Sequence, residues 1–443
     1  MNRKLQSRST LMAAGALLLV LLVLLGASSV LQLFPDQQAG QPVKLYFADN
    51  ISPAHQRLID AFNREYSGQI ELVPVNLPFT KFSTNERKEL LARAMRSKSD
   101  RIDVFAVDLI WVPRFAKWAE PLNDYFHVQS DLQDILPAAI TSCSYGGRLV
   151  AIPFYLDIGL MYYRKDLLPT LGSEGALEKE LKESITWEHL LALGRQRPET
   201  VRPLYLFAAK NFEGLMCSFW ELYYGLGNGP PENDGIQLDW PRARQALQFL
   251  VDLVQKYRFT PVEVTRFDEM ATYRFALETD ALFFRGWPGI KRNVHLSDPE
   301  LNRKLQRVQP AALPHFAGKP ALSVFGGWNL MISRYSTKKE AAVKFLRFVL
   351  RRESQKKMYL QGGYLPVKGA LYNDPDLLAT DPDLPYYQKL IQRGVHRPFD
   401  VDYTKISEGM ALSFHRAIKG EITVEEALNQ VQKILPGHSL VNR

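Results

Sequence analysis

The stretch GGRLVAIPFYLDIGLMYYRKDLL, residues 146–168, decides how the chain is organised. It holds two apolar runs of strand character with a single acid, Asp157, between them. A strand buried on both faces rarely carries an ionised side chain unless that charge is paired or has a task. Asp157 therefore predicts either a buried ion pair with Arg164 or Lys165, or a carboxylate that faces a ligand.

Strand and helix signals alternate on both sides of this stretch. Strands are predicted at 43–48, 70–75, 102–107, 204–208 and 281–284. Helices are predicted after Ser52-Pro53, at 85–98, from 111 to 118, from Thr186, at 214–226, at 242–257, and after the capping boxes at 337–340 and 423–426. This order predicts an α/β fold with a largely parallel sheet, whose strand ends are natural ligand positions.

Length and charge limit the number of lobes and the kinds of partner that can be expected of this chain. A chain of 443 residues exceeds one ordinary core, so two lobes are expected. The net charge of +8 and the pI near 9.2 give a basic surface. The basic residues are spread along the chain without a helix-turn-helix, zinc-finger or base-stacking signature, so no nucleic-acid partner is expected.

The N-terminus predicts export. Arg3, Lys4 and Arg8 precede the uncharged, apolar run 12–34, which is longer than the apolar core of most cleaved signals. Residues 1–36 are therefore expected to be a signal peptide or a retained signal anchor, with everything after them outside the cytoplasm.

The segment Leu25-Gly26-Ala27-Ser28 resembles a bacterial lipoprotein cleavage box, but Ser28 stands where the lipidated cysteine would be. The protein is therefore expected not to be lipidated, and to be periplasmic or held at the outer face of the cytoplasmic membrane. Residues 37–42 are interpreted as a short linker.

Catalytic and metal-binding motifs are missing from the sequence. It contains no HExxH, CxxC, GxSxG, Walker or GxGxxG pattern, and its histidines have no metal-ligand spacing. Its two cysteines, Cys143 and Cys217, are predicted to be separate buried thiols, although an exported chain also permits a disulfide. No enzyme activity, cofactor or metal is expected.

Five segments together resemble the extracellular carbohydrate-binding proteins that serve ABC importers, the relatives of maltodextrin- and trehalose-binding proteins. The resemblance covers about residues 43 to 435 and rests on DVFAVDLIWVPRFAKWAEPL (103–122), AIPFYLDIGLMYYRKDLL (151–168), ALFFRGWPG (281–289), FGGWNLMISRYSTKKEAAVKFLRF (325–348) and GGYLPVKGAL (362–371). It implies the two-lobed Venus-flytrap fold of type II periplasmic binding proteins, which closes over a sugar. It also implies an ABC permease as partner, and a monomer is expected.

The resemblance also implies where the lobes divide. Lobe one is expected to comprise 43–155 and 330–367, and lobe two 156–329 and 368–443. The chain would cross between them near Asp157, near 327–329 and near 366–369.

Site residues follow from the same family motifs and from sugar chemistry. A pyranose offers apolar C–H faces to aromatic rings and hydroxyls to carboxylates. Trp287 and Trp328 are expected to be the platforms, the aromatic rings on which the sugar stacks. The other expected ligand residues are Asp157, Asp108, Trp111, Tyr155, Gly327, Asp49, Glu213 and Tyr403. Near Tyr403 and Met410 the chain lacks the aromatic residue of maltose-type relatives, which argues against a long maltodextrin.

Three alternatives stay open at this point. The protein could report its ligand to a membrane sensor. It could bind ferric ion on the same fold through its adjacent tyrosines, 162–163, 223–224 or 386–387. An extracellular glycosidase with paired carboxylates is the least favoured alternative.

Overall fold

The stretch around Asp157 links two separate sheets. The computed structural model describes residues 41–435 except 80, 172–173, 197–202, 228, 231–235 and 295. Strand β6 (Ile152–Ile158) belongs to a six-stranded sheet and the next strand, β7 (Leu160–Arg164), to a four-stranded one, with only Gly159 between them. Asp157 thus lies next to the point at which the chain passes from one sheet to the other.

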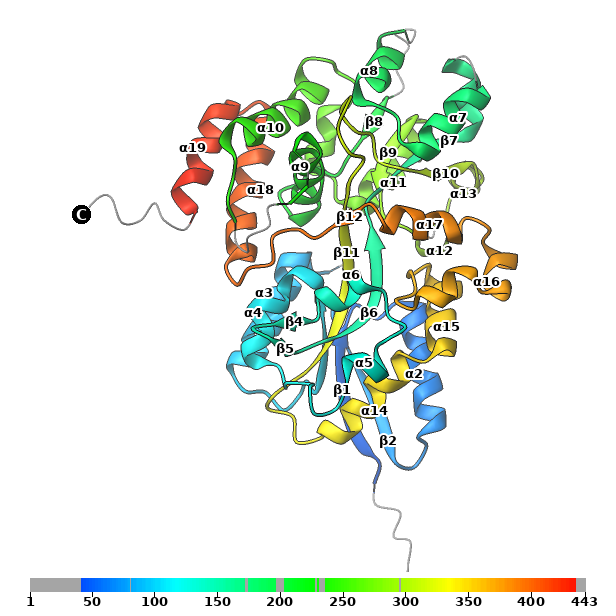
Figure 1. Cartoon of the computed structure of the whole chain (residues 1–443), viewed down its shortest axis with the longest axis vertical. Helices are drawn as coiled ribbons and strands as arrows, with labels where there is room; N and C mark the ends of the chain where they lie inside the picture. Colours follow the sequence, from blue (N-terminus) through cyan, green and yellow to red (C-terminus); the bar gives the residue numbers. More distant parts are fainter. Residues whose placement is uncertain are drawn as a thin grey trace, which may run out of the picture.

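The six-stranded sheet forms the core of the first lobe, the lower one in Figure 1. Its strands are β1 (Val43–Asp49), β2 (Ile70–Asn76), β3 (Val104–Asp108), β6, β11 (Ser323–Ile332) and β12 (Gly394–Val395). The helices of this part are α2 (Pro53–Glu65), α3 (Thr84–Arg96), α4 (Val112–Phe115), α5 (Val128–Asp131), α6 (Pro137–Thr141), α14 (Lys339–Val349) and α15 (Arg352–Gly362). The short pair β4 (Ser144–Tyr145) and β5 (Arg148–Leu149) precedes β6.

The four-stranded sheet, with strand order β10-β7-β9-β8, forms the core of the second lobe. Its other strands are β8 (Tyr205–Leu206), β9 (Phe283–Gly286) and β10 (Val308–Ala311). Its helices are α7 (Glu174–Glu183), α8 (Trp187–Gln196), α9 (Glu213–Leu226), α10 (Trp240–Gln255), α11 (Glu269–Glu278), α12 (Ile290–Asn293), α13 (Pro299–Gln306), α18 (Tyr403–Lys419) and α19 (Val424–Ile434). Helices α16 (Pro375–Thr380) and α17 (Leu384–Ile391) lie beside α15 and the crossing strands (Figure 1). The fold is the predicted two-lobed α/β fold, while the residue boundaries of its lobes stay a prediction.

The prediction of a largely parallel sheet is only partly right. Strand β1 pairs in parallel with β2 and β3, as the β-α order predicts. Strand β11, however, is antiparallel to both β3 and β6, and β7 is antiparallel to β9 and β10. The physical reason is that β6 carries the chain out of the first sheet and β11 carries it back (Figure 1). Two neighbouring strands that cross in opposite directions must pair antiparallel.

Local signals account for most helix starts. Ser52 accepts a hydrogen bond from the His55 amide and begins α2, and Thr423 forms the predicted capping box with Glu426. The box predicted at Thr337 is wrong, because α14 begins after Lys338 without a side-chain cap. There the Ser336 hydroxyl accepts from the Lys338 amide and donates to buried Asp103 instead. The helix expected at 111–118 is a 3-10 turn, the short α4 and a second 3-10 turn.

Two further predictions concern the termini and the cysteines. The N-terminal membrane segment, 1–36, lies outside the described residues, as does most of the linker. Among the described helices, none combines the length and the apolar character needed to cross a membrane. Cys143 and Cys217 are both buried and free, so the prediction of separate thiols is confirmed.

The pairing of β6 with β11 predicts a sensitive glycine. Gly327 has φ +127°, and a Cβ there would lie 2.5 Å from the Tyr155 carbonyl oxygen on β6. We expect Gly327→Ala to lower the free energy of unfolding by about 2 to 3 kcal/mol, because backbone strain and a backbone clash add. Urea unfolding measures the loss. Gly318→Ala is the control, since Gly318 has φ +70° but open space around it, and it should cost about 1 kcal/mol. Equal losses in the two variants would contradict the role of the strand contact.

Candidate functional site

The ten predicted site residues form one connected region where the two sheets meet. Strand register places Trp328 opposite Asp108 on β3 and opposite Tyr155 on β6, and it places Gly326 opposite Asp157. A Cβ on Gly326 would lie 3.3 Å from Asp157 Cβ and 2.9 Å from the Trp287 ring, so these two side chains are neighbours. The glycine pair at 326–327 therefore permits close packing inside the protein, in addition to any approach to a ligand.

Trp328 is packed mainly against its own lobe. It is 8% exposed, and the Arg87 guanidinium lies 4.3 Å from the centroid of its ring. Trp111 meets it edge-on at 5.3 Å between centroids. Much of the Trp328 surface is thus already covered by protein.

Trp287 is half-buried and belongs to the other lobe, directly after β9. The Arg285 guanidinium covers one face of its ring at 3.8 Å from the centroid, and Glu221 holds that guanidinium at 2.9 Å. The indole Nε1 donates to Glu269 at 3.4 Å. The ring is thus fixed on one face and at one edge, as a platform requires.

Asp157 has no ion-pair partner among the residues that the structure describes. Arg164 pairs with Asp166 and Asp280, and Lys165 pairs with Glu178. The alternative of an ion pair between Asp157 and either cation is therefore wrong, while its contact with a ligand stays a prediction. Among the described residues no hydrogen bond reaches its carboxylate. Burial, together with the negative charge of Asp108, raises the pKa of Asp157 to about 8, against the opposing effect of Arg285.

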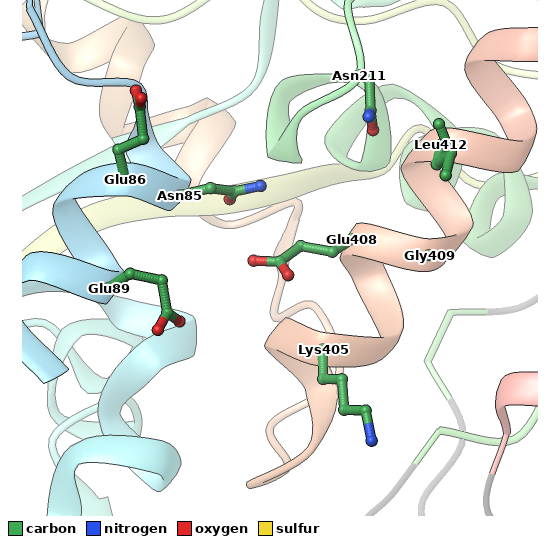
Figure 2. A pocket seen from close by; sticks show the side chains of 8 residues that line it. All are labelled: Asn85, Glu86, Glu89, Asn211, Lys405, Glu408, Gly409 and Leu412. Carbon is green, nitrogen blue, oxygen red and sulfur yellow. The ribbon is translucent and has the colours of Figure 1, made fainter. Parts of the chain in front are cut away.

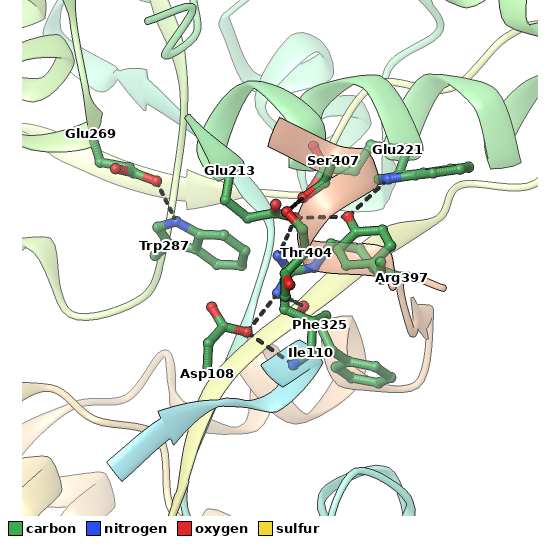
Figure 3. A network of polar contacts seen from close by, with 12 residues as sticks. Asp108, Ile110, Glu213, Glu221, Glu269, Trp287, Phe325, Arg397, Thr404 and Ser407 are labelled. Atoms are coloured by element: carbon green, nitrogen blue, oxygen red, sulfur yellow. Dashed lines mark hydrogen bonds and ion pairs between the residues drawn. The ribbon is translucent and has the colours of Figure 1, made fainter. Parts of the chain in front are cut away.

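A buried arginine that the sequence analysis missed joins three of the predicted residues. Arg397 donates to Asp108 of the first lobe at 3.1 Å and to Glu213 of the second at 2.8 Å. Tyr403 donates to the same Glu213 oxygen at 2.7 Å and accepts from Trp220 Nε1 at 3.0 Å. Figure 3 shows this network, with Trp287 and Glu269 beside it. A lone arginine in a polar loop gives no sequence signal of such a position.

Asp49 belongs to a second buried charge group. Its carboxylate accepts from Arg87 at 2.8 Å, and its Oδ2 lies 3.5 Å from Nε2 of His55. Oδ2 of Asp49 and the Nε and Nη1 atoms of Arg87 are buried and have no hydrogen-bond partner in the described part of the chain. Such unpaired buried atoms are costly, and they mark groups that a ligand or a water can satisfy.

An open groove of about 560 Å³ lies between α3 of the first lobe and α18 of the second. Asn85, Glu86 and Glu89 of α3 line one side, and Asn211 with Lys405, Glu408, Gly409 and Leu412 of α18 line the other (Figure 2). None of the ten predicted residues lines it. Contact of the predicted residues with a ligand stays a prediction.

The hydroxyls of the adjacent tyrosines 162–163 do not meet at one site. Tyr162 donates to the Trp287 carbonyl and Tyr163 to Glu178, so the two hydroxyls serve different neighbours. In the described part of the chain, no three His, Cys, Asp or Glu side chains gather in a way that could hold a metal ion.

Comparisons with protein families, with curated proteins and with solved structures all find solute-binding proteins. The family model of bacterial extracellular solute-binding proteins matches residues 48–356. A probable ABC transporter-binding protein of Deinococcus radiodurans is 26% identical over 85% of this chain and 87% of its own length. The structure of T. maritima MalE3 with bound maltose is 28% identical with a TM-score of 0.77, over 88% of this chain and 98% of its own. A Thermotoga lettingae ABC transporter solute-binding protein with bound α-D-tagatose is 21% identical with a TM-score of 0.72, over 88% and 98%.

The raised pKa of Asp157 predicts a pH-dependent stability. The folded state keeps this proton up to about pH 8, whereas a free carboxyl releases it near 3.8. The contribution of Asp157 to stability is therefore fully present below pH 4 and is lost as the pH rises through about 8. Asp157→Asn cannot ionise, so we expect its melting temperature to rise relative to the unsubstituted protein between pH 5 and pH 9.

Thermal unfolding at several pH values measures this difference. Asp124→Asn, at an exposed position, is the control and should follow the unsubstituted protein. A difference between Asp157→Asn and the unsubstituted protein that does not change with pH would contradict the raised pKa of this carboxyl.

Proposed function

Because the chain belongs to the family of bacterial extracellular solute-binding proteins, we propose that it binds a sugar between its lobes and delivers it to an ABC permease. The proposed ligand is a disaccharide or a small oligosaccharide. Open and closed forms exchange by motion at the crossing strands, and a sugar that touches both lobes favours the closed form.

The observation that carries this proposal is the surroundings of Trp287. One face and one edge of its ring are held by Arg285 and Glu269, and Asp157 lies beside it. An aromatic ring with nearby carboxylates matches the alternating apolar faces and hydroxyl edges of a pyranose. Carboxylates from both lobes, Asp108 and Glu213, lie nearby in the Arg397 network.

Asp157 suits a polyhydroxyl ligand in either protonation state. As a carboxylate it accepts charge-assisted hydrogen bonds from two hydroxyls, and as a neutral acid it donates one and accepts another. No described residue pairs with its carboxylate, so this capacity is left for the ligand.

The solved relatives support a sugar, since one holds maltose and another tagatose. The surroundings of Tyr403 support a short one. This residue is fully buried, and its hydroxyl serves Glu213 and Trp220, so it offers no open ring surface for further sugar units.

The remaining proposals concern location and assembly. The family implies a periplasmic or membrane-surface location. We propose that residues 1–36 export the protein or anchor it there, that it acts as a monomer, and that it has no catalytic role.

A ligand screen tests the proposal directly. The purified full chain is heated with mono-, di- and oligosaccharides, with ferric ion and polyamines as controls. A ligand at about 100 times its dissociation constant adds about 2.7 kcal/mol of stability, so the melting temperature should rise clearly with one class of sugar. A shift with ferric ion or a polyamine, and with no sugar, would contradict the proposal.

Trp287→Ala tests the platform. With the sugar found in the screen, we expect binding measured by calorimetry to weaken by about 1 to 3 kcal/mol, because an aromatic contact is lost. Trp240→Ala is the control, since Trp240 begins α10, away from the crossing strands, and it should keep full affinity. Equal affinity of the two variants would remove Trp287 from the site.

A further inference from the structure

Two ion-pairing residues outside the predicted ligand site join the lobes. Lys88 of α3 binds Glu408 of α18, and the side chain of Lys88 is 1% exposed whereas that of Glu408 is 40% exposed. Helix α3 belongs to the first lobe, and α18 packs on α9, α10 and α19 of the second. Figure 2 shows Glu408 pointing from α18 across the groove toward α3.

A second contact lies one helical turn away on the same face of α18. Arg114 of α4 donates to Thr404 at 2.9 Å and to Glu89 of α3 at 2.7 Å. Thr404 and Glu408 are four residues apart, so α18 presents both to the first lobe. The Arg397 bond to Asp108 adds a third contact deeper inside.

We propose that Lys88 and Glu408 set the affinity of the protein without touching its ligand, by holding the lobes together before a ligand arrives. The inference rests on the closing motion of the proposed function, but it does not depend on which ligand binds.

The charge arrangement explains why this pair is sensitive. In the arrangement of the lobes seen here Lys88 is shielded from water, and Glu408 is the partner that offsets its desolvation. Without Lys88, Glu408 would face Glu86 and Glu89 across the groove. If the lobes separate, the Lys88 ammonium regains contact with water and no longer needs Glu408 as its partner. The pair therefore acts on the closed arrangement, and its loss shifts the population toward the open one.

The distance between the lobes measures this shift directly, in the absence of any sugar. Nitroxide labels at Arg93→Cys on α3 and Gln245→Cys on α10 occupy exposed positions, while both native cysteines are buried. Pulsed electron resonance then gives the distance distribution of the full chain in mild detergent. We expect the unsubstituted, labelled protein to show mainly the short distance, and Glu408→Lys to reduce the ratio of short to long distances about tenfold.

Two further variants make the test specific. The exchanged pair Lys88→Glu with Glu408→Lys should restore the short distance. Glu278→Lys makes the same charge change at a side chain that is 42% exposed and pairs with Arg274 in its own helix, so it should leave the distribution unchanged.

Three outcomes would overturn the inference. They are a long distance already in the unsubstituted protein, no change in Glu408→Lys, and no restoration in the exchanged pair. Because no sugar is present, these outcomes leave the sugar screen untouched, and a failed screen would leave the inference standing.

Discussion

The antiparallel pairing of β6 with β11 is the constraint on which the rest of the molecule depends. Every residue of β11 is buried, and this strand lies between β3 and β6 in one sheet. It needs glycine at 326 and 327, because the Trp287 ring lies against one position and the Tyr155 carbonyl against the other. Since both strands also lead into the second lobe, their pairing fixes where Asp157, Trp287 and Trp328 meet. The site is therefore a consequence of how the chain changes lobes.

Many charged side chains around this junction are buried. The three arginines at 87, 285 and 397 each hold a carboxylate. None of these three arginines pairs with Asp157. Burial also raises the pKa of Glu213 and of Glu269. The junction thus contains more acids than its arginines neutralise. Such a surplus disfavours anionic solutes and suits a neutral one rich in hydroxyls.

The sequence alone was enough to predict the fold class. The ten residues that it singled out lie in one connected region, and their contact with a ligand stays a prediction. Alternation of apolar runs with capped helices is a local signal, and it identified β1, β2, β3 and the helices between them. The antiparallel strands could not be predicted this way, because β11 reaches its place through contacts with residues far away in sequence. Arg397 was missed for the same reason, because its contacts are also far away in sequence. It lies 184 positions from Glu213 and 289 from Asp108, and nothing around it marks it as buried.

The order of strands in the first sheet has a consequence for how the chain folds as it is made. Strand β3 needs β11 as its neighbour, and β6 pairs with the same strand. Until residue 332 has emerged, both therefore keep an unpaired edge, and no N-terminal fragment can complete its own core. Contacts of such long sequence separation form late and slowly. Completion of the first sheet therefore waits for a strand that lies more than two hundred residues after β3 in the sequence.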